Sequence, residues 1–279
     1  MSPNLGTAIV AVEAALRNAM TKGTPRPFVL GISGAQGSGK STLSAALAES
    51  MRGIGITTAV LSIDDIYHTK ADRIALARQV HPLFAVRGVP GTHDVGLGLK
   101  IIEAIDNGCA VRLPRFDKAA DDRASEAVWE EAPADTALLI LEGWCLGAQP
   151  EAEEALIAPI NDLERLEDSD GRWRRAVNTA LGSDYQRLFG RTDMLVFLAA
   201  PGFDVVRDWR IEQEHALART AGSDASAVMS DAQVENFIRF YERLTRHILA
   251  EMPSRADLLI RLAADRAPLS VHYHRYASP

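Results

Sequence analysis

The chain of 279 residues has few cysteines, few aromatic residues, no excess of basic residues and no long apolar run. Because it lacks a run of about eighteen apolar residues and a basic-then-apolar N-terminal segment, we expect a cytoplasmic protein without a membrane partner. Two cysteines, Cys109 and Cys145, are too few for a disulfide framework and lack metal-ligand spacing. The net charge of −7 argues against a nucleic-acid-binding surface.

What the chain does contain is a glycine-rich stretch between an apolar segment and a helix-forming one. Gly34–Ser41 matches the pattern G-x-x-x-x-G-K-[ST], Phe28–Leu30 before it is typical of a buried strand, and Thr42–Met51 after it is rich in alanine and leucine. This setting is the one that a phosphate-binding loop requires. A flexible glycine turn is the alternative, but the residue types and the flanking segments favour a nucleotide phosphate site.

The residue types of this stretch fit the binding of Mg-ATP. Glycines allow backbone N–H groups to converge on phosphate oxygens, and the start of the following helix adds unpaired donors. Lys40 is expected at the β- and γ-phosphates, and the Ser41 hydroxyl is expected to bind Mg²⁺. The residues predicted to contact the nucleotide are Gly34, Ala35, Gln36, Gly37, Ser38, Gly39, Lys40, Ser41 and Thr42.

Carboxylates follow two further predicted strands. Asp64 and Asp65 lie at the end of the β-branched run Thr57–Ile63, and Glu142 follows the apolar run Ala137–Leu141. Carboxyl ends of parallel strands are where open α/β sheets bind ligands. One carboxylate could accept a proton from a substrate hydroxyl while another orients it or holds Mg²⁺. For the aspartate pair, helix capping is the alternative. The predicted metal ligands are Ser41, Asp64 and Glu142.

Two loops concentrate polar side chains that suit a small hydroxy acid. Residues 87–94 read Arg-Gly-Val-Pro-Gly-Thr-His-Asp, in which the arginine suits a carboxylate and the histidine and aspartate suit hydroxyls. Capping of a helix at 95–107 by Thr92 or Asp94 is an alternative that can hold at the same time. Residues 114–123 carry charges of both signs, and a solvated loop explains them as well as a substrate lid does.

A predicted helix at 203–219 carries two arginines on one face. Arg207 and Arg210 are three residues apart, so either could reach over the phosphates. An i,i+4 ion pair between Arg210 and Glu214 is the alternative. After the last predicted strand, residues 263–266 form a loop where an adenine edge could be bounded.

Together these segments resemble the P-loop D-glycerate 3-kinase family, the plant-type glycerate kinases and their bacterial relatives. That family lies within the phosphoribulokinase/uridine kinase/pantothenate kinase superfamily. The phosphate loop identifies only the superfamily, whereas residues 87–94 with Glu142-Gly143-Trp144 are far more particular to glycerate kinases. The other segments that carry the resemblance are Asp64-Asp65-Ile66-Tyr67, Phe116-Asp117-Lys118, Asp122-Arg123, Trp209-Arg210 and Met229-Ser230-Asp231.

The resemblance implies a three-layer α/β P-loop kinase fold, with a mainly parallel sheet of five core strands and helical insertions. One domain would span 1–279, with an N-terminal helix in 1–24, acceptor-binding loops in 80–135 and a helical insertion in 143–190. The implied reaction is in-line transfer of the γ-phosphoryl group of Mg-ATP to D-glycerate, giving 3-phosphoglycerate.

The resemblance also implies roles for single residues. Asp64 would be the base or the group that orients the hydroxyl, supported by Asp65 and Glu142. Lys40 would neutralise phosphate charge, and one of the two arginines at 207 and 210 would stabilise charge in the transition state. The implied acceptor-binding residues are Tyr67, Arg87, Thr92, His93, Asp94, Asp117, Lys118 and Arg123.

The identity of the acceptor depends on one departure from the plant-type pattern, and two other functions are alternatives. Lys118 is followed by Ala119 in a short loop, where plant-type members have a longer Asp-Lys-Ser segment, so a hydroxyl and some backbone are missing. A kinase of the same fold for pantothenate or a nucleoside is one alternative, although 6% aromatic residues disfavours nucleoside stacking. An ATP-binding regulator without turnover is the other, and the strand-end carboxylates speak against it.

Overall fold

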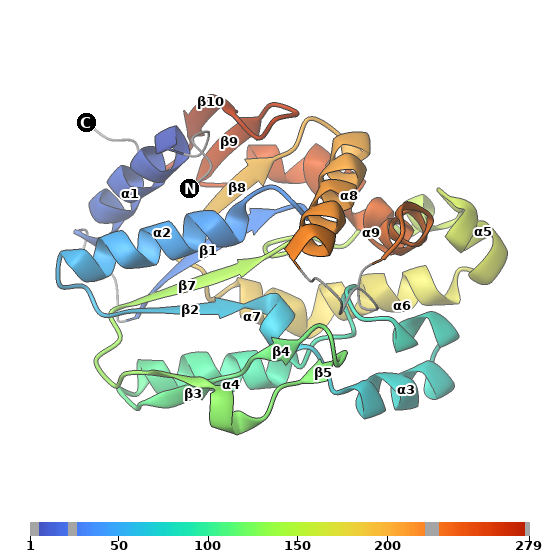
Figure 1. Cartoon of the computed structure of the whole chain (residues 1–279), viewed down its shortest axis with the longest axis horizontal. Coiled ribbons are helices and arrows are strands. Elements are labelled where there is room, and N and C mark those ends of the chain that lie inside the picture. The colour runs from blue at the N-terminus through green and yellow to red at the C-terminus, as the bar shows by residue number, and fades with distance from the viewer. Residues whose placement is uncertain (1–5, 22–26, 221–228, 277–279) are drawn as a thin grey trace.

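The structure, a computed structural model, describes residues 6–21, 27–220 and 229–276, excepting the side chains of 217–220. Its centre is a six-stranded sheet with the strand order β10-β9-β8-β1-β7-β2 (Figure 1). Five of these strands are parallel and β10 runs antiparallel at one edge. The strands are β1 Phe28–Gly34, β2 Thr58–Ser62, β7 Leu138–Gly143, β8 Met194–Ala199, β9 Leu258–Leu262 and β10 Pro268–Tyr273.

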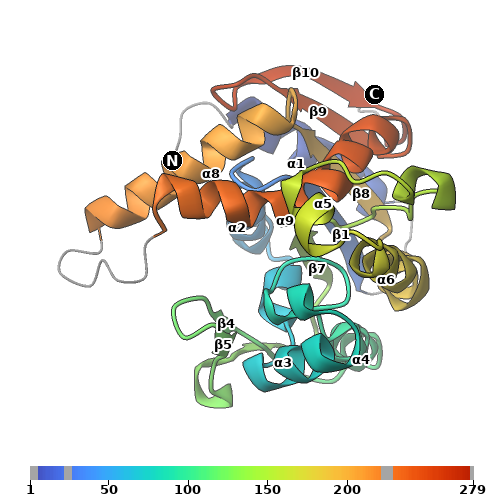
Figure 2. The same cartoon turned by 90° about the vertical axis from the view of Figure 1, so that its right-hand side faces the viewer.

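Helices cover both faces of this sheet. On one face α1 and α2 pack on the strands, and on the other lie α7 and the end of α9 (Figures 1 and 2). Every residue of β1, β7 and β8 is buried, which explains their continuous apolar sequences. The α-helices are α1 Gly6–Met20, α2 Lys40–Gly53, α3 Lys70–Gln79, α4 Val95–Asp106, α5 Asp162–Glu167, α6 Arg172–Ala180, α7 Gln186–Phe189, α8 Phe203–Thr220 and α9 Asp231–Glu251.

Short elements complete the fold beside the sheet. Two small antiparallel strand pairs, β3 Val111–Leu113 with β6 Glu130–Ala132 and β4 Phe116–Asp117 with β5 Asp122–Arg123, lie next to α3 and α4. A π-helical turn, Leu181–Tyr185, joins α6 to α7. The 3₁₀ helices are Ile63–Ile66, Pro82–Ala85, Glu126–Val128, Glu153–Leu156 and Met252–Ser254.

The predicted α/β fold with five parallel strands is confirmed. The antiparallel strand β10 was not predicted, because it is half exposed and lacks an apolar run. Within the helical insertion expected in 143–190, a π-helical turn with a non-helical Ser183 separates α6 from α7. The N-terminal helix lies within 1–24 as α1, and residues 1–5 and 22–26 fall outside the described part of the chain. Among the described residues, no helix combines the length and the apolar character needed to cross a membrane.

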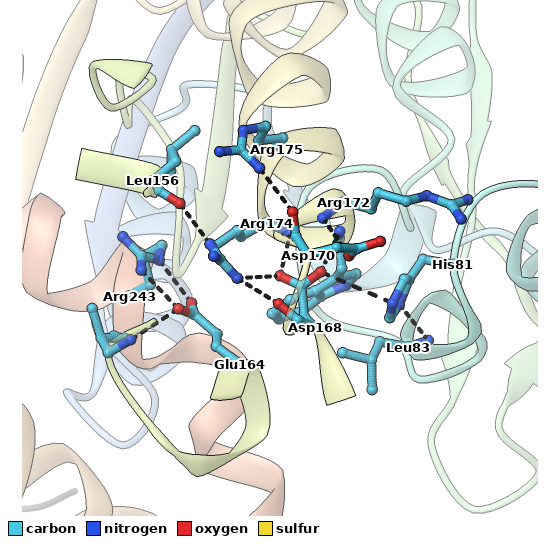
Figure 3. A network of polar contacts seen from close by, with 12 residues as sticks. His81, Leu83, Leu156, Glu164, Asp168, Asp170, Arg172, Arg174, Arg175 and Arg243 are labelled. Atoms are coloured by element: carbon cyan, nitrogen blue, oxygen red, sulfur yellow. Dashed lines mark hydrogen bonds and ion pairs between the residues drawn. The ribbon is translucent and has the colours of Figure 1, made fainter. Parts of the chain in front are cut away.

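Two arginines, the buried Arg174 and the half-buried Arg243, hold the acidic segment at 150–170, whose sequence shows no clear apolar pattern (Figure 3). Arg174 donates to the carbonyl oxygens of Leu156 and Ile157 and to the buried Asp168 carboxylate at 2.9 Å. Arg243 of α9 makes two hydrogen bonds of 2.7 Å to the buried Glu164 carboxylate. It also donates to the carbonyl oxygens of residues 155 and 158. Charged pairs therefore fix this segment where apolar burial is scarce.

Replacing Arg174 by methionine should destabilise the protein strongly, because it leaves the Asp168 charge buried without its cation. Removing one partner of a buried ion pair lowers the free energy of unfolding by about 3–5 kcal/mol. Urea unfolding monitored by circular dichroism measures the change. The matched control is Arg187→Met, which breaks an exposed pair with Asp184 and should change the free energy by less than about 1 kcal/mol. Equal effects of the two substitutions would contradict this account.

Candidate active site

A cavity opens at the carboxyl ends of β1, β2 and β7 and is closed by residues from α8 and α9. The predicted site residues that line it come from the phosphate loop, from both strand-end acidic segments and from three other places in the chain. They are Gln36, Gly37, Lys40, Ser41, Asp64, Tyr67, Arg87, Lys118, Glu142 and Arg210. Gln213, Phe237 and Tyr241, which were not predicted as site residues, also line it.

The phosphate loop has the backbone geometry that its glycines allow. Gly37 and Gly39 have φ angles of 77° and 90°, in the left-handed region that favours glycine. Helix α2 begins at Lys40, directly after Gly39, so its unpaired N–H groups face the loop. A Cβ atom on Gly34 would lie 2.7 Å from the Ser38 hydroxyl, so this position also has no room for a side chain.

Two other parts of the fold brace the loop. Trp209 of α8 packs on Gly37, where an added Cβ would lie 2.6 Å from the Trp209 Cβ. The Arg266 guanidinium donates to the Gly37 carbonyl at 2.7 Å and lies over the Trp209 ring. The Trp209 indole N–H in turn donates to the carbonyl of Ala264 at 2.6 Å. The turn at 263–266, expected at an adenine edge, thus contacts the phosphate loop itself.

Ser41 and Glu142 form the group best suited to a divalent cation. The Ser41 hydroxyl donates to one Glu142 carboxylate oxygen at 3.0 Å. The other oxygen, Oε2, is buried and has no hydrogen-bond partner. A buried carboxylate oxygen without a partner is costly, and a cation or its bound water would satisfy it. These two side chains therefore fit Mg²⁺, which prefers oxygen ligands and retains water.

Asp64 faces the cavity with both carboxylate oxygens hydrogen-bonded. Oδ1 accepts from the Tyr67 hydroxyl at 3.0 Å, and Oδ2 accepts from the Lys118 ammonium at 2.9 Å. Burial raises the pKa of Asp64, but the charges of Lys118 and Lys40 and the hydrogen bond from Lys118 outweigh it and hold that pKa well below its usual range. Asp64 is thus a carboxylate in the site.

Asp65 points away from the cavity, although it adjoins Asp64 in the sequence. Its carboxylate accepts from the backbone N–H of Phe116 at 3.1 Å and from Arg115 at 3.2 Å. Burial raises the pKa of Asp65, and the hydrogen bond from Phe116 and the charge of Arg115 oppose the rise. The structure therefore has Asp65 anchor β4, and with it the segment that carries Lys118, rather than line the cavity.

The loop at 87–94 folds on itself and on Tyr185 of the π-helical turn. Thr92 is buried, and its hydroxyl accepts from Gly88 N–H and donates to the Val89 carbonyl. The Tyr185 hydroxyl accepts from the backbone N–H groups of Gly91 and His93 and lies 2.6 Å from His93 Nδ1. Having one proton, this hydroxyl must donate it to Nδ1, which places the imidazole proton on Nε2.

His93 therefore supports the site from within the core. Its ring stacks on Tyr67 with 4.4 Å between centroids, and Tyr67 in turn donates to Asp64. Burial lowers the pKa of His93 to about 3, so the ring is neutral near neutral pH. The prediction of a direct acceptor contact finds no support in this geometry, because His93 does not line the cavity.

Several other predicted acceptor residues also bind the protein's own backbone or its own charges. Asp94 caps α4 through the Leu97 N–H and pairs with Arg123, so the capping alternative holds. Arg123 also donates to the Tyr67 carbonyl. Asp117 is exposed and accepts from the two N–H groups that follow Lys118, at 119 and 120, which shapes the turn.

Arg87 does line the cavity, and two aromatic residues fix its backbone. The Tyr241 hydroxyl donates to the Arg87 carbonyl at 3.2 Å, and the Trp144 indole N–H donates to the Gly88 carbonyl at 3.0 Å. The Arg87 guanidinium pairs with Asp121. Tyr241 and Tyr185 were not predicted as site residues, since their sequence positions are typical of ordinary core aromatics.

Of the two helix arginines, the structure brings only Arg210 to the cavity. Arg210 pairs with the buried Glu214 and lies over the Phe237 ring, so the predicted ion pair is present as well. Arg207 is exposed, pairs with Asp208 and does not line the cavity, so a role over the phosphates does not fit its position. Helices α8 and α9, which frame this side, project together from the body (Figure 2).

One further group of potential metal ligands occurs among the described residues, at His81, Asp168 and Asp170. Its groups are already used (Figure 3). Asp168 accepts from two backbone N–H groups and from Arg174. His81 Nδ1 accepts from the N–H of Leu83, so its Nε2 carries the proton of the neutral ring. This group therefore serves the fold.

Replacing Gly37 by alanine should weaken ATP binding by about tenfold or more, because the new Cβ would clash with Trp209 and distort the phosphate cradle. Isothermal titration calorimetry with ATP and Mg²⁺ measures it. Gly55→Ala is the matched control, since Gly55 has a similar φ of 83° but no atom within 4 Å of an added Cβ. Unchanged ATP affinity of Gly37→Ala would contradict the proposed phosphate site.

Comparison with known proteins identifies relatives of this chain. The model of the Phosphoribulokinase / Uridine kinase family matches residues 29–149. The chain is 37% identical over 227 residues to the uncharacterized kinase mug58 of Schizosaccharomyces pombe, covering 77% of this chain and 79% of that one. It is 30% identical over 262 residues to the chloroplastic D-glycerate 3-kinase of Arabidopsis thaliana, covering 87% of this chain but 54% of the plant protein.

A solved structure of D-glycerate 3-kinase from Cryptococcus neoformans shares the fold, with a TM-score of 0.76 at 23% identity over 96% of this chain and 99% of that one. The family model and the sequence relatives thus place the chain among P-loop kinases, and the solved structure shares its fold. The chain belongs to the phosphoribulokinase/uridine kinase superfamily of P-loop kinases.

Proposed function

We propose that the protein is a D-glycerate 3-kinase, which transfers the γ-phosphoryl group of Mg-ATP to a hydroxyl of D-glycerate and yields 3-phosphoglycerate and ADP. The observation that carries the proposal is the composition of one cavity. Lys40 and Ser41 of the phosphate loop line it, and so do Asp64 and two cations suited to a carboxylate, Arg87 and Lys118. The 30% identity to a plant D-glycerate 3-kinase supports the same acceptor.

The residues divide the chemistry between them. Asp64 orients the acceptor hydroxyl and takes its proton as the oxygen attacks the γ-phosphorus. Lys40 and the loop N–H groups bind the phosphate oxygens, and Arg210 lies where it can offset charge that develops during transfer. Bound Mg²⁺ would neutralise phosphate charge, and Ser41 and Glu142 are the residues that would hold it.

The acceptor is tested by measuring ADP formation by the purified protein with Mg-ATP and D-glycerate, L-glycerate, pantothenate, uridine or no acceptor. We expect rapid turnover with D-glycerate alone and 3-phosphoglycerate as its product. Asp64→Asn should lower kcat by about a hundredfold or more while ATP still binds, since the proton acceptor is lost. Turnover with another acceptor and none with D-glycerate would contradict the proposed acceptor. ATP binding without any turnover would favour an ATP-binding regulator.

Tyr185→Phe tests whether the loop at 87–94 forms part of the acceptor site. The substitution keeps the ring but removes the hydroxyl that binds two loop N–H groups and His93. An unpaired buried donor costs about 1–3 kcal/mol, so we expect KM for D-glycerate to rise about tenfold and KM for ATP to stay the same. Tyr273→Phe, on the exposed strand β10, is the control. Equal changes in both KM values would point to a general structural defect.

A further inference from the structure

The cations in the cavity are already paired with carboxylates of the protein. Four cationic side chains line the cavity among the described residues, and Lys40 belongs to the phosphate loop. Of the other three, Arg87 pairs with Asp121, Arg210 with Glu214 and Lys118 with Asp64. An acceptor that carries a negative charge must therefore take a cation from one of these pairs.

The pair that involves Lys118 is the easiest to exchange. The Lys118 side chain is 62% exposed, whereas those of Arg87 and Arg210 are 22% and 16% exposed. The Lys118 ammonium sits on a flexible stem in the short turn between β4 and β5, while Arg87 also lies over the Phe116 ring and Arg210 over the Phe237 ring. Exposed ion pairs are weak, so a ligand carboxylate can replace Asp64 as the partner of Lys118.

This ion pair matters because its carboxylate belongs to Asp64, which is proposed to accept a hydrogen bond from the acceptor hydroxyl. Tyr67 donates to Asp64 Oδ1 and Lys118 donates to Oδ2, so the two oxygens already accept one hydrogen bond each on the cavity side. Each oxygen has room for one more hydrogen bond, but with Lys118 in place a hydroxyl or a water molecule shares Asp64 with an ammonium group. Charge-assisted hydrogen bonds are stronger than neutral ones, so the ammonium is the favoured donor.

We propose that Lys118 is a latch on Asp64 that an anionic acceptor opens. This inference rests on the proposed function, with Asp64 facing the acceptor hydroxyl. The carboxylate of the acceptor draws the Lys118 ammonium off Asp64, and the freed oxygen accepts the hydroxyl of the same molecule. Neutral alcohols and water carry no charge that draws Lys118 away, so Lys118 both favours acids as acceptors and slows ATP hydrolysis when no acceptor is bound.

This role differs in its consequences from simple binding of a substrate carboxylate. If Lys118 only bound the carboxylate, removing it would weaken turnover of D-glycerate and leave glycerol phosphorylation and ATP hydrolysis unchanged. If Lys118 is a latch, removing it also exposes Asp64 to any hydroxyl. In the hydrolysis reaction the water oxygen attacks the γ-phosphorus, its proton passes to Asp64, and ADP and phosphate leave.

The test compares the wild type with Lys118→Met in three assays: D-glycerate phosphorylation, glycerol phosphorylation, and ATP hydrolysis without an acceptor. For Lys118→Met we expect kcat/KM for D-glycerate to fall. We expect kcat/KM for glycerol and the rate of ATP hydrolysis to rise by about fivefold, the scale of an exposed ion pair. Lys118→Arg should keep the latch. Lys100→Met, on the exposed face of α4, is the matched control and should behave as the wild type.

The outcomes separate this inference from the proposed function. Loss of D-glycerate activity in Lys118→Met with no gain in glycerol phosphorylation or ATP hydrolysis would overturn the latch and leave the kinase assignment intact. A gain that survives in the double variant Lys118→Met/Asp64→Asn would overturn it too, because the gain must pass through Asp64. If the wild type does not phosphorylate D-glycerate, the proposed function is refuted. The ATP hydrolysis assay then still tests the latch, because it needs no acceptor.

Discussion

The parallel pairing of β1, β7 and β2 is the constraint on which the site depends. In this register Glu142 lies beside Ile32 on one side and beside Ser62 on the other, so the three strands end at the same level. A Cβ on Gly143 would lie 2.4 Å from Ile63, which shows how closely β7 passes the turn that carries Asp64. The sheet therefore sets the spacing of the Asp64 and Glu142 carboxylates, and the loops supply the other side chains that line the cavity.

Charge pairing is the second feature that shapes the site. A charged group that is partly buried without a partner is costly, and three cations of the cavity, Arg87, Lys118 and Arg210, are each paired with a carboxylate of the chain. The Ser41 hydroxyl is likewise used by Glu142 until a cation takes both. Ligand affinity in such a site depends on the free-energy difference between the ion pairs formed with the ligand and the ion pairs within the protein that the ligand replaces. Selectivity then follows from which internal pairs a ligand is able to replace.

The parts of the site that could be predicted from the sequence are those whose geometry is local. The phosphate loop needs glycines at fixed spacing before a helix, and buried parallel strands need continuous apolar runs, so both patterns are visible in the residues. The role of Asp65 could not be predicted, because it depends on contacts with Arg115 and Phe116 some fifty positions away. Arg207 and Arg210 lie three residues apart on one face of a helix, so the sequence pattern does not distinguish them. Only the packing of α8 shows which of the two reaches the cavity.

The loop at 87–94 shows why other parts of the site could not be predicted from the sequence. Its backbone is held by the polar tips of Trp144, Tyr185 and Tyr241, which come from the end of β7, the π-helical turn and α9. Each of these residues looks like a core aromatic in the sequence, and each packs as one in the structure. One buried ring therefore serves both purposes, since its face fills the core while its hydroxyl or N–H fixes a loop. The shape of the loop at 87–94 thus depends on distant parts of the fold, whereas the glycine pattern of the phosphate loop lies within consecutive residues, although Trp209 and Arg266 brace it from outside.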